Sequence, residues 1–146
     1  LEVAAVLEEV SSEINDLISA TNAQINTSFA SAPVVFMVAH DLKSILYNLL
    51  TNAIKFHAPD RPPVVNIETA ATEKGTFIRV SDNGIGIDLP KHEHKIFAIF
   101  CRLTNTVSGT GIGLYIIKRI LDNYRGKIKV KSTPGQGSTF EIFLPN

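Results

Sequence analysis

The strands predicted for this 146-residue chain are grouped together, and they do not alternate one by one with helices. Apolar and β-branched runs bounded by Gly, Pro, Asn and Ser predict each strand. The predicted strands are Gln24–Phe29, Val34–Val38, Val64–Thr72, Thr76–Asp82, Lys127–Ser132 and Ser138–Leu144. Such grouping favours an α+β two-layer sandwich over a doubly wound parallel sheet.

Three stretches have the apolar spacing of helices. Leu1–Ala20 is predicted as a short strand running into an amphipathic helix. Asp41–Phe56 is the clearest helix, ended by three nearby prolines, and Ile112–Tyr124 is a second strong helix. Because the chain has 146 residues, 45% of them hydrophobic and 19% charged, we expect residues 1–146 to form one compact domain.

The charge balance excludes some classes of partner. Fourteen basic residues match fourteen acidic ones, so we expect neither nucleic-acid binding nor direct membrane contact by this domain. The single cysteine, Cys101, excludes an internal disulfide and fits a reducing, cytoplasmic location. Since the chain starts at Leu1 instead of methionine, we expect it to be part of a longer protein, and whether that parent is anchored in a membrane stays open.

The Asp41–Phe56 helix carries Asn48, Asn52 and Lys55 on one edge, within roughly 60° of one another. Asparagine is a mediocre helix former, so the two asparagines do not raise the helix propensity of this segment. A solvated helix face is one interpretation. The other is that the amide oxygens hold a hard cation such as Mg²⁺ while the lysine supplies charge to phosphates.

A glycine-rich segment, Asp82-Asn83-Gly84-Ile85-Gly86, directly follows a predicted strand. Its glycines allow backbone conformations and a close ligand approach that a Cβ would block. An ionised aspartate only accepts hydrogen bonds, so Asp82 suits the amine of adenine and disfavours the O6 acceptor of guanine. A plain Asp-Asn-Gly turn between strands is the alternative.

A second glycine run, Gly109-Thr110-Gly111-Ile112-Gly113-Leu114, opens the last helix. Small residues at a helix N-terminus leave N–H groups and a positive dipole end available to a phosphate chain. The run is neither a Walker loop nor a Rossmann fingerprint, because the Lys-Ser/Thr pair and the preceding strand are missing. Alone, it is weak evidence for a phosphate site.

Taken in this order, the three elements resemble Bergerat-type ATPases and, within them, the catalytic domain of histidine kinases. Asn48–Phe56 is similar to the N box of that family and Asp82–Gly86 to its first glycine box. Ile96–Phe100 resembles the F box and Gly109–Leu114 the second glycine box. Gly137-Ser138-Thr139-Phe140 is similar to the final strand, where a threonine neighbours the adenine-binding aspartate. The resemblance extends from Leu1 to Pro145.

This resemblance implies the Bergerat fold, with a mixed, largely antiparallel sheet and three main helices packed on one face. It implies that Asp82 binds the adenine amine, that Thr139 helps through water, and that Asn52 is the principal Mg²⁺ ligand. The remaining implied ATP-binding residues are Asn48, Lys55, Gly84, Gly86, Ile87, Gly109, Thr110, Gly111, Ile112, Gly113 and Leu114. Arg102 is either a further contact to the γ-phosphate or a solvated surface arginine.

The implied activity is transfer of the γ-phosphoryl group of ATP to a histidine on a separate helical dimerisation domain, for relay to an aspartate of a response regulator. We expect no general base in this chain, because such transfer depends on positioning and charge neutralisation. Alternatives are another Bergerat-type ATPase, such as an anti-sigma serine kinase or a gyrase-like or chaperone-like enzyme, and a nucleotide-sensing module without turnover.

Two histidine motifs are not assigned a role. His40-Asp41-Leu42-Lys43 resembles the phosphoacceptor box, but that box has a proline where this chain has Ile45 and lies on a separate dimerisation helix. We therefore expect His40 to begin the Asp41–Phe56 helix. His92-Glu93-His94 has the composition of a loose metal motif, yet two histidines in a loop-like segment are more simply solvated.

Overall fold

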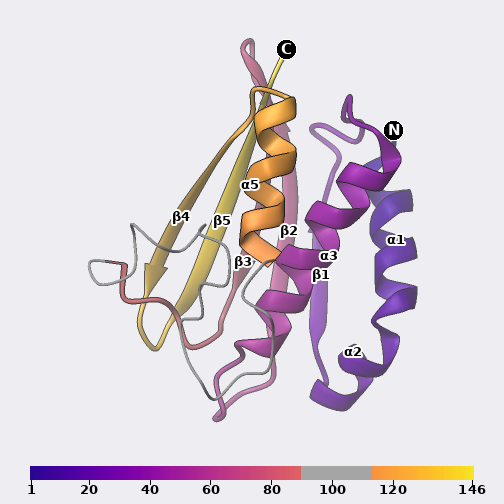
Figure 1. Cartoon of the computed structure of the whole chain (residues 1–146). Coiled ribbons are helices and arrows are strands. Elements are labelled where there is room, and N and C mark those ends of the chain that lie inside the picture. The colour runs from indigo at the N-terminus through magenta and orange to yellow at the C-terminus, as the bar shows by residue number, and fades with distance from the viewer. Residues whose placement is uncertain (90–112) are drawn as a thin grey trace.

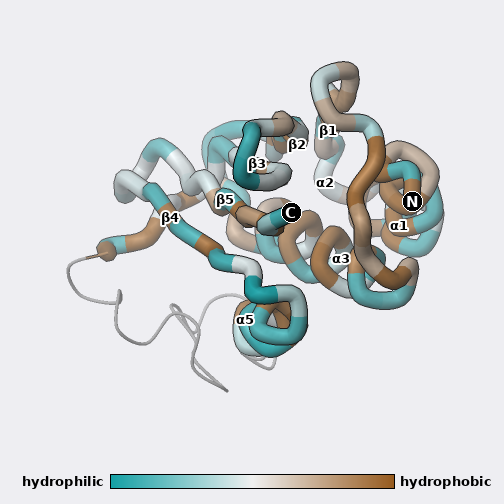
Figure 2. Tube along the Cα trace, turned by 90° about the horizontal axis from the view of Figure 1, so that it is seen from above, coloured by the Kyte–Doolittle hydropathy of each residue, from teal (hydrophilic) through white to brown (hydrophobic). Residues whose placement is uncertain are grey.

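The computed structural model describes residues 1–89 and 113–146, and its five strands form one open sheet with helices on one face (Figure 1, Figure 2). The strand order is β1-β2-β3-β5-β4, with β1 parallel to β2 and all other neighbours antiparallel. The strands are β1 Gln24–Ser28, β2 Val64–Ala71, β3 Gly75–Asp82, β4 Lys127–Thr133 and β5 Gly137–Pro145. The predicted two-layer α+β sandwich with a mixed, largely antiparallel sheet is confirmed.

Four helices lie within the described residues: α1 Val3–Glu13, α2 Asn15–Thr21, α3 Ala39–Lys55 and α5 Gly113–Asn123. The long helix α3 occupies the centre of the helical layer and contacts α1, α5 and the sheet (Figure 2). Its apolar stripe, which includes Leu42, Ile45 and Leu49, is buried against the sheet residues Ile78 and Ile142. Helix α3 begins two residues before the predicted Asp41, and Phe56 is its C-cap.

The prediction of an N-terminal strand before the first helix is wrong. Helix α1 already begins at Val3, and among the described residues the only pairing that precedes it is an isolated bridge between Glu2 and Val34. The helix predicted to reach Ala20 is interrupted at Ile14, which ends α1 and precedes α2. A sequence without Pro or Gly at this position carries no signal for the break.

The strand predicted at Val34–Val38 is also absent, and only Val34 forms a bridge. Residues 33–35 exchange backbone hydrogen bonds with Leu1 and Val3, but α1 starts there and ends the pairing. The segment still alternates like a strand, with Val35 and Met37 buried and Phe36 94% exposed. Its apolar alternation therefore reflects packing against the core without the formation of a ladder.

The remaining strands agree with the predictions to within one residue at each end, and β5 lies between β3 and β4 although it is last in sequence. The sheet face turned away from the helices carries polar and aromatic side chains. On it, Arg79 forms ion pairs with Glu68 at 2.7 Å and Glu141 at 2.6 Å. Within residues 1–89 and 113–146, the helices are all too short or too polar to cross a bilayer.

Candidate functional site

A cavity of about 290 Å³ lies between α3, the segment after β3, the β4–β5 turn and the first turn of α5. Its lining residues are Asn52, Ala53, Phe56, Asp82, Ile85, Gly86, Ile87, Asp88, Leu114, Pro134, Ser138 and Phe140. The structure thus brings five residues of the predicted site together in one cavity: Asn52, Asp82, Gly86, Ile87 and Leu114. Most of the other lining residues are apolar, which gives the cavity a hydrophobic wall that is interrupted by four polar residues, Asn52, Asp82, Asp88 and Ser138.

Asp82 is the last residue of β3 and is half-buried. Its Oδ1 accepts hydrogen bonds from the backbone N–H of Gly84 at 2.9 Å and of Ser138 at 3.2 Å. Both bonds use Oδ1, so Oδ2 has no hydrogen-bond partner among the described residues. Burial raises the pKa of Asp82 above its usual value, although the two backbone donors lower it. The site therefore holds a poorly solvated carboxylate with acceptor capacity to spare.

The two glycines after Asp82 allow the segment to pack against neighbouring backbone. A β-carbon on Gly84 would collide with the carbonyl oxygen of Phe56 at the end of α3. Gly86 has a φ of +75°, and a β-carbon there would collide with the carbonyl oxygen of Thr133. Only glycine combines this conformation with such close approach. Gly86 lines the cavity, whereas Gly84 lies behind its wall.

The α3 asparagines face the start of α5. Asn48 donates from Nδ2 to the carbonyl oxygen of Ser44 at 2.8 Å, which orients its amide. A β-carbon on Gly113, the first residue of α5, would stand 2.9 Å from Asn48 Oδ1 and 3.6 Å from Asn52 Nδ2. Glycine therefore lets the helix N-terminus approach both amides. Lys55 is exposed on α3 and is not part of the cavity lining.

Strand β5 places Ser138, and not Thr139, beside Asp82. Ser138 is buried, lines the cavity and bonds to Asp82 through its backbone N–H. Thr139 pairs with Ser81, to whose hydroxyl it donates a 3.1 Å hydrogen bond. Successive residues of a strand point to opposite faces of a sheet, so only one of these two can face the cavity.

Several predicted residues lie outside the described part of the chain. These are Arg102, Gly109, Thr110, Gly111 and Ile112, together with the F-box segment Ile96–Phe100, Cys101 and the His92-Glu93-His94 motif. From the second glycine box, the structure describes Gly113 and Leu114.

Most of the apolar wall belongs to none of the sequence motifs that predict the site. Ala53 on α3 and Phe56, the C-cap of that helix, lie near Asn52, and helical spacing alone could have suggested them. Phe140 follows Ser138 by two residues on β5, on the same face of the strand. Ile85 and Pro134 come from loops 49 residues apart in sequence, and no local pattern joins them.

Residues 37–146 match the profile of a family described as histidine kinase-, DNA gyrase B-, and HSP90-like ATPase. The chain belongs to this ATPase family. Since the match begins inside the segment before α3, it covers every element that lines the cavity.

Among curated members of this ATPase family, the chain is 36% identical over 146 residues to the phytochrome-like protein Cph1 of Synechocystis. It is 34% identical over 142 residues to the phosphate regulon sensor protein PhoR of Pseudomonas aeruginosa. These alignments cover 99% and 94% of this chain but only 19% of Cph1 and 31% of PhoR. The chain therefore spans a fifth to a third of the length of these relatives.

Solved structures of other proteins share the fold. The mycobacterial sensor histidine kinase MprB matches with a TM-score of 0.81 at 21% identity, over 99% of this chain and 96% of that one. The catalytic domain of histidine kinase ThkA matches with a TM-score of 0.82 at 24% identity, over 99% of this chain and 93% of that one. These matches show that the chain shares its fold with two histidine kinases, over nearly its whole length.

Proposed function

We propose that residues 1–146 form one domain that binds Mg-ATP in this cavity and delivers its γ-phosphoryl group to a histidine of a partner domain. The observation that carries the proposal is the position of the Asp82 carboxylate. It lies in an apolar cavity that also contains Asn52, next to the N-terminus of α5. These are the groups that an adenine base, a cation and a phosphate chain would each require.

The base would occupy the apolar part of the cavity. Asp82 Oδ2 would accept a hydrogen bond from the exocyclic amine of adenine, while Ile87, Phe56 and Phe140 supply apolar contact area. A volume of about 290 Å³ is near the lower end of small-molecule pockets. Guanine would present its O6 acceptor to the same carboxylate and be repelled.

The phosphates would extend from the base toward Asn52 and the first turn of α5. Asn52 would ligate Mg²⁺ through its amide oxygen, with Asn48 beside it and Lys55 on the same edge of α3. When bound, the ion would neutralise phosphate charge, as hard oxygen-seeking cations do. The N-terminal N–H groups of α5 and its dipole favour negative charge at this place. Gly109, Thr110, Gly111, Ile112 and Arg102 are proposed as further phosphate contacts.

The transfer step would proceed on another domain's histidine. The imidazole nitrogen would form a bond to the γ-phosphorus while the bond to the β–γ bridging oxygen breaks and ADP leaves. This domain would contribute positioning and charge neutralisation, not a general base. We infer that the acceptor lies on a helical dimerisation domain of the same protein and that a response regulator aspartate then receives the phosphate. Because ATP is a cytoplasmic substrate, we place the domain there.

Incubation with γ-labelled ATP tests this proposal. His40 is the second residue of α3, so it is built into the helix that carries Asn48 and Asn52. We expect Mg-ATP to bind to residues 1–146 without any acid-labile label on the chain, because the acceptor must stand in line about 3–3.5 Å from the phosphorus. Adding the parent protein's dimerisation domain as a separate chain should produce label on that domain alone. Acid-labile label on His40 would overturn the proposal.

A further inference from the structure

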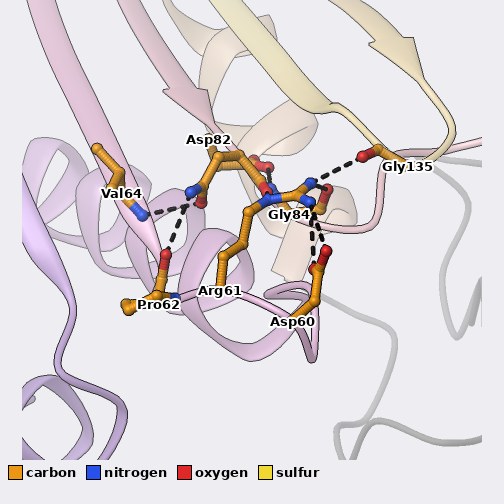
Figure 3. Close-up of polar contacts among 8 residues, drawn as sticks. Asp60, Arg61, Pro62, Val64, Asp82, Gly84 and Gly135 are labelled. Atoms are coloured by element: carbon orange, nitrogen blue, oxygen red, sulfur yellow. Dashed lines mark hydrogen bonds and ion pairs between the residues drawn. The ribbon is translucent and has the colours of Figure 1, made fainter.

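Arg61 lies in the loop between α3 and β2, and its guanidinium group contacts three backbone carbonyl oxygens (Figure 3). Nε donates to Asn83 O at 2.8 Å, and Nη2 donates to Gly135 O at 2.8 Å and to Gly84 O at 3.3 Å. The remaining nitrogen, Nη1, pairs with Asp60 at 3.2 Å. One side chain thus joins segments that are 22 and 74 residues away in sequence.

These three carbonyls belong to the two loops that form the base side of the cavity, which is the part proposed to hold the adenine base. Asn83 and Gly84 stand between Asp82 and Ile85, and Gly135 follows Pro134; Asp82, Ile85 and Pro134 all line the cavity. Arg61 itself does not line it. It therefore contacts the wall from behind, on the side that a ligand would not reach.

Other bonds also hold these loops, and one of them uses the Ser132 hydroxyl, which accepts from Ile87 N–H at 2.7 Å and donates to Gly137 O at 2.9 Å. Gly135 N–H donates to Ile85 O at 2.7 Å. The Asn83 amide accepts from Val64 N–H at 2.9 Å and donates to Pro62 O at 3.1 Å (Figure 3). A planar guanidinium presents its donors in a fixed fork, which lets one group bond three carbonyls at once. A lysine ammonium lacks that geometry.

We propose that Arg61 is a positioning residue that sets the distance between the Asp82–Ile85 segment and the β4–β5 turn, and thereby the affinity for the adenine moiety. This inference rests on the proposed nucleotide site. Arg61 contacts neither Asn48 nor Asn52 in the structure, so its loss should loosen the base side and leave the phosphate side intact. Adenosine and Mg-ATP should therefore lose the same factor in affinity.

The test compares Arg61→Met with Arg79→Met, in which the same change removes an arginine that holds two carboxylates on the opposite sheet face. Calorimetric titration of each variant with adenosine and with Mg-ATP should show roughly tenfold weaker binding of both ligands to Arg61→Met. Arg79→Met should bind both like the wild type, to within about twofold. Circular dichroism establishes that each variant is folded at the titration temperature.

The outcomes are distinct. If the wild type binds neither adenosine nor Mg-ATP, the proposed function fails. The role of Arg61 is overturned if the wild type binds and Arg61→Met binds both ligands with wild-type affinity. It is also overturned if Arg61→Met loses affinity for Mg-ATP but not for adenosine. In both cases the proposed nucleotide site of the wild type stands. An equal loss in Arg79→Met would also overturn it, because general destabilisation would then explain both. Should Arg61→Met not fold, Arg61→Lys replaces it, and wild-type affinity for adenosine in that variant contradicts the inference.

Discussion

The hydroxyl of Tyr124 donates a 2.6 Å hydrogen bond to Asp41 Oδ2 and accepts one from the backbone N–H of Val38 at 3.1 Å. Tyr124 directly follows α5, and Asp41 lies in the first turn of α3. The bond therefore fastens the C-terminal end of α5 to the N-terminal end of α3. At its other end α5 meets α3 again, where Gly113 approaches Asn48.

Tyr124→Phe should lower the free energy of unfolding by about 1–2 kcal/mol at neutral pH, since the bond to Asp41 is charge-assisted but partly solvated. Urea denaturation measures this, and Tyr47→Phe is the matched control because Tyr47 is 41% exposed. Burial and the bond to Asp41 raise the pKa of Tyr124 above its model-peptide value of 10.0. The stabilisation should thus be complete below pH 10 and fade as the pH rises above it. Equal stabilities of the two variants would refute the prediction.

Asp82→Asn should weaken ATP binding by about 1.5–3 kcal/mol, the range for hydrogen bonds to charged groups. The asparagine keeps an oxygen for the Gly84 and Ser138 N–H groups but offers adenine a neutral amide. Titration with a fluorescent nucleotide measures the loss, and GTP is the control ligand. Unchanged ATP affinity, or equal affinity of the wild type for ATP and GTP, would remove Asp82 from the adenine site.

The same variant should be more stable than the wild type without nucleotide. Burial raises the folded-state pKa of Asp82 above 3.8, so the folded protein carries a poorly solvated charge at neutral pH that the unfolded chain exposes to water. The protonated Asp82 carboxyl contributes fully to the stability of the wild type below pH 3.8. This contribution is lost as the pH rises through the folded-state pKa of Asp82. The thermal unfolding midpoint of Asp82→Asn should be higher than that of the wild type at pH 7. The difference between the two midpoints should become smaller as the pH falls toward 4. A lower midpoint at pH 7 would contradict this account.

Asn52→Ala should remove the Mg²⁺-dependent part of ATP binding, because its amide oxygen would be the principal ligand of the ion. The variant should fold, since the Asn52 amide makes no hydrogen bond within the described part of the chain. Adenosine, which has no phosphates, should bind the variant and the wild type equally. Titrations with and without Mg²⁺ separate these contributions, and parallel losses of adenosine and ATP affinity would make Asn52 a structural residue.

Ser138→Val and Thr139→Val decide which β5 residue belongs to the site. Ser138 lines the cavity beside Asp82, so a branched apolar side chain there should reduce ATP affinity roughly tenfold or more. Thr139 bonds to Ser81 on β3, so its valine variant should bind ATP with an affinity within about twofold of wild type. The reverse ranking would favour a water-mediated contact from Thr139, as the family resemblance implies.

Local patterns could predict most of the elements. Helix α3 and strands β2 to β5 carry strong periodicity between clear turn residues, and their ends fall within two residues of the prediction. The segment at residues 34–38 has the same alternation but forms no strand, because a strand also needs a partner backbone along its length. Periodicity reports which side chains are buried and does not report whether a neighbour is present.

The site was predictable where a motif lies within one segment, and less so where two segments meet. Asn52 and Asp82 follow from their own local sequence, and the cavity contains both. Choosing between Ser138 and Thr139 requires the register of β5 against β3, in which a shift of one residue exchanges the two faces. Arg61 lacks a local signal altogether, because its partners come from loops that only the folded sheet brings together.

The position of β5 between β3 and β4 affects how the domain is made (Figure 1). This strand emerges from the ribosome after every other strand of the sheet, yet it forms both of the pairings that join β4 to the rest. Until Gly137–Pro145 is synthesised, β3 and β4 present unpaired edges, which are sites for aggregation. Ser138 and Phe140 also complete the cavity only then. Nascent chains stopped before Gly137 should therefore be unable to retain nucleotide and should depend on chaperones, even though nearly all of the binding motifs have already been translated.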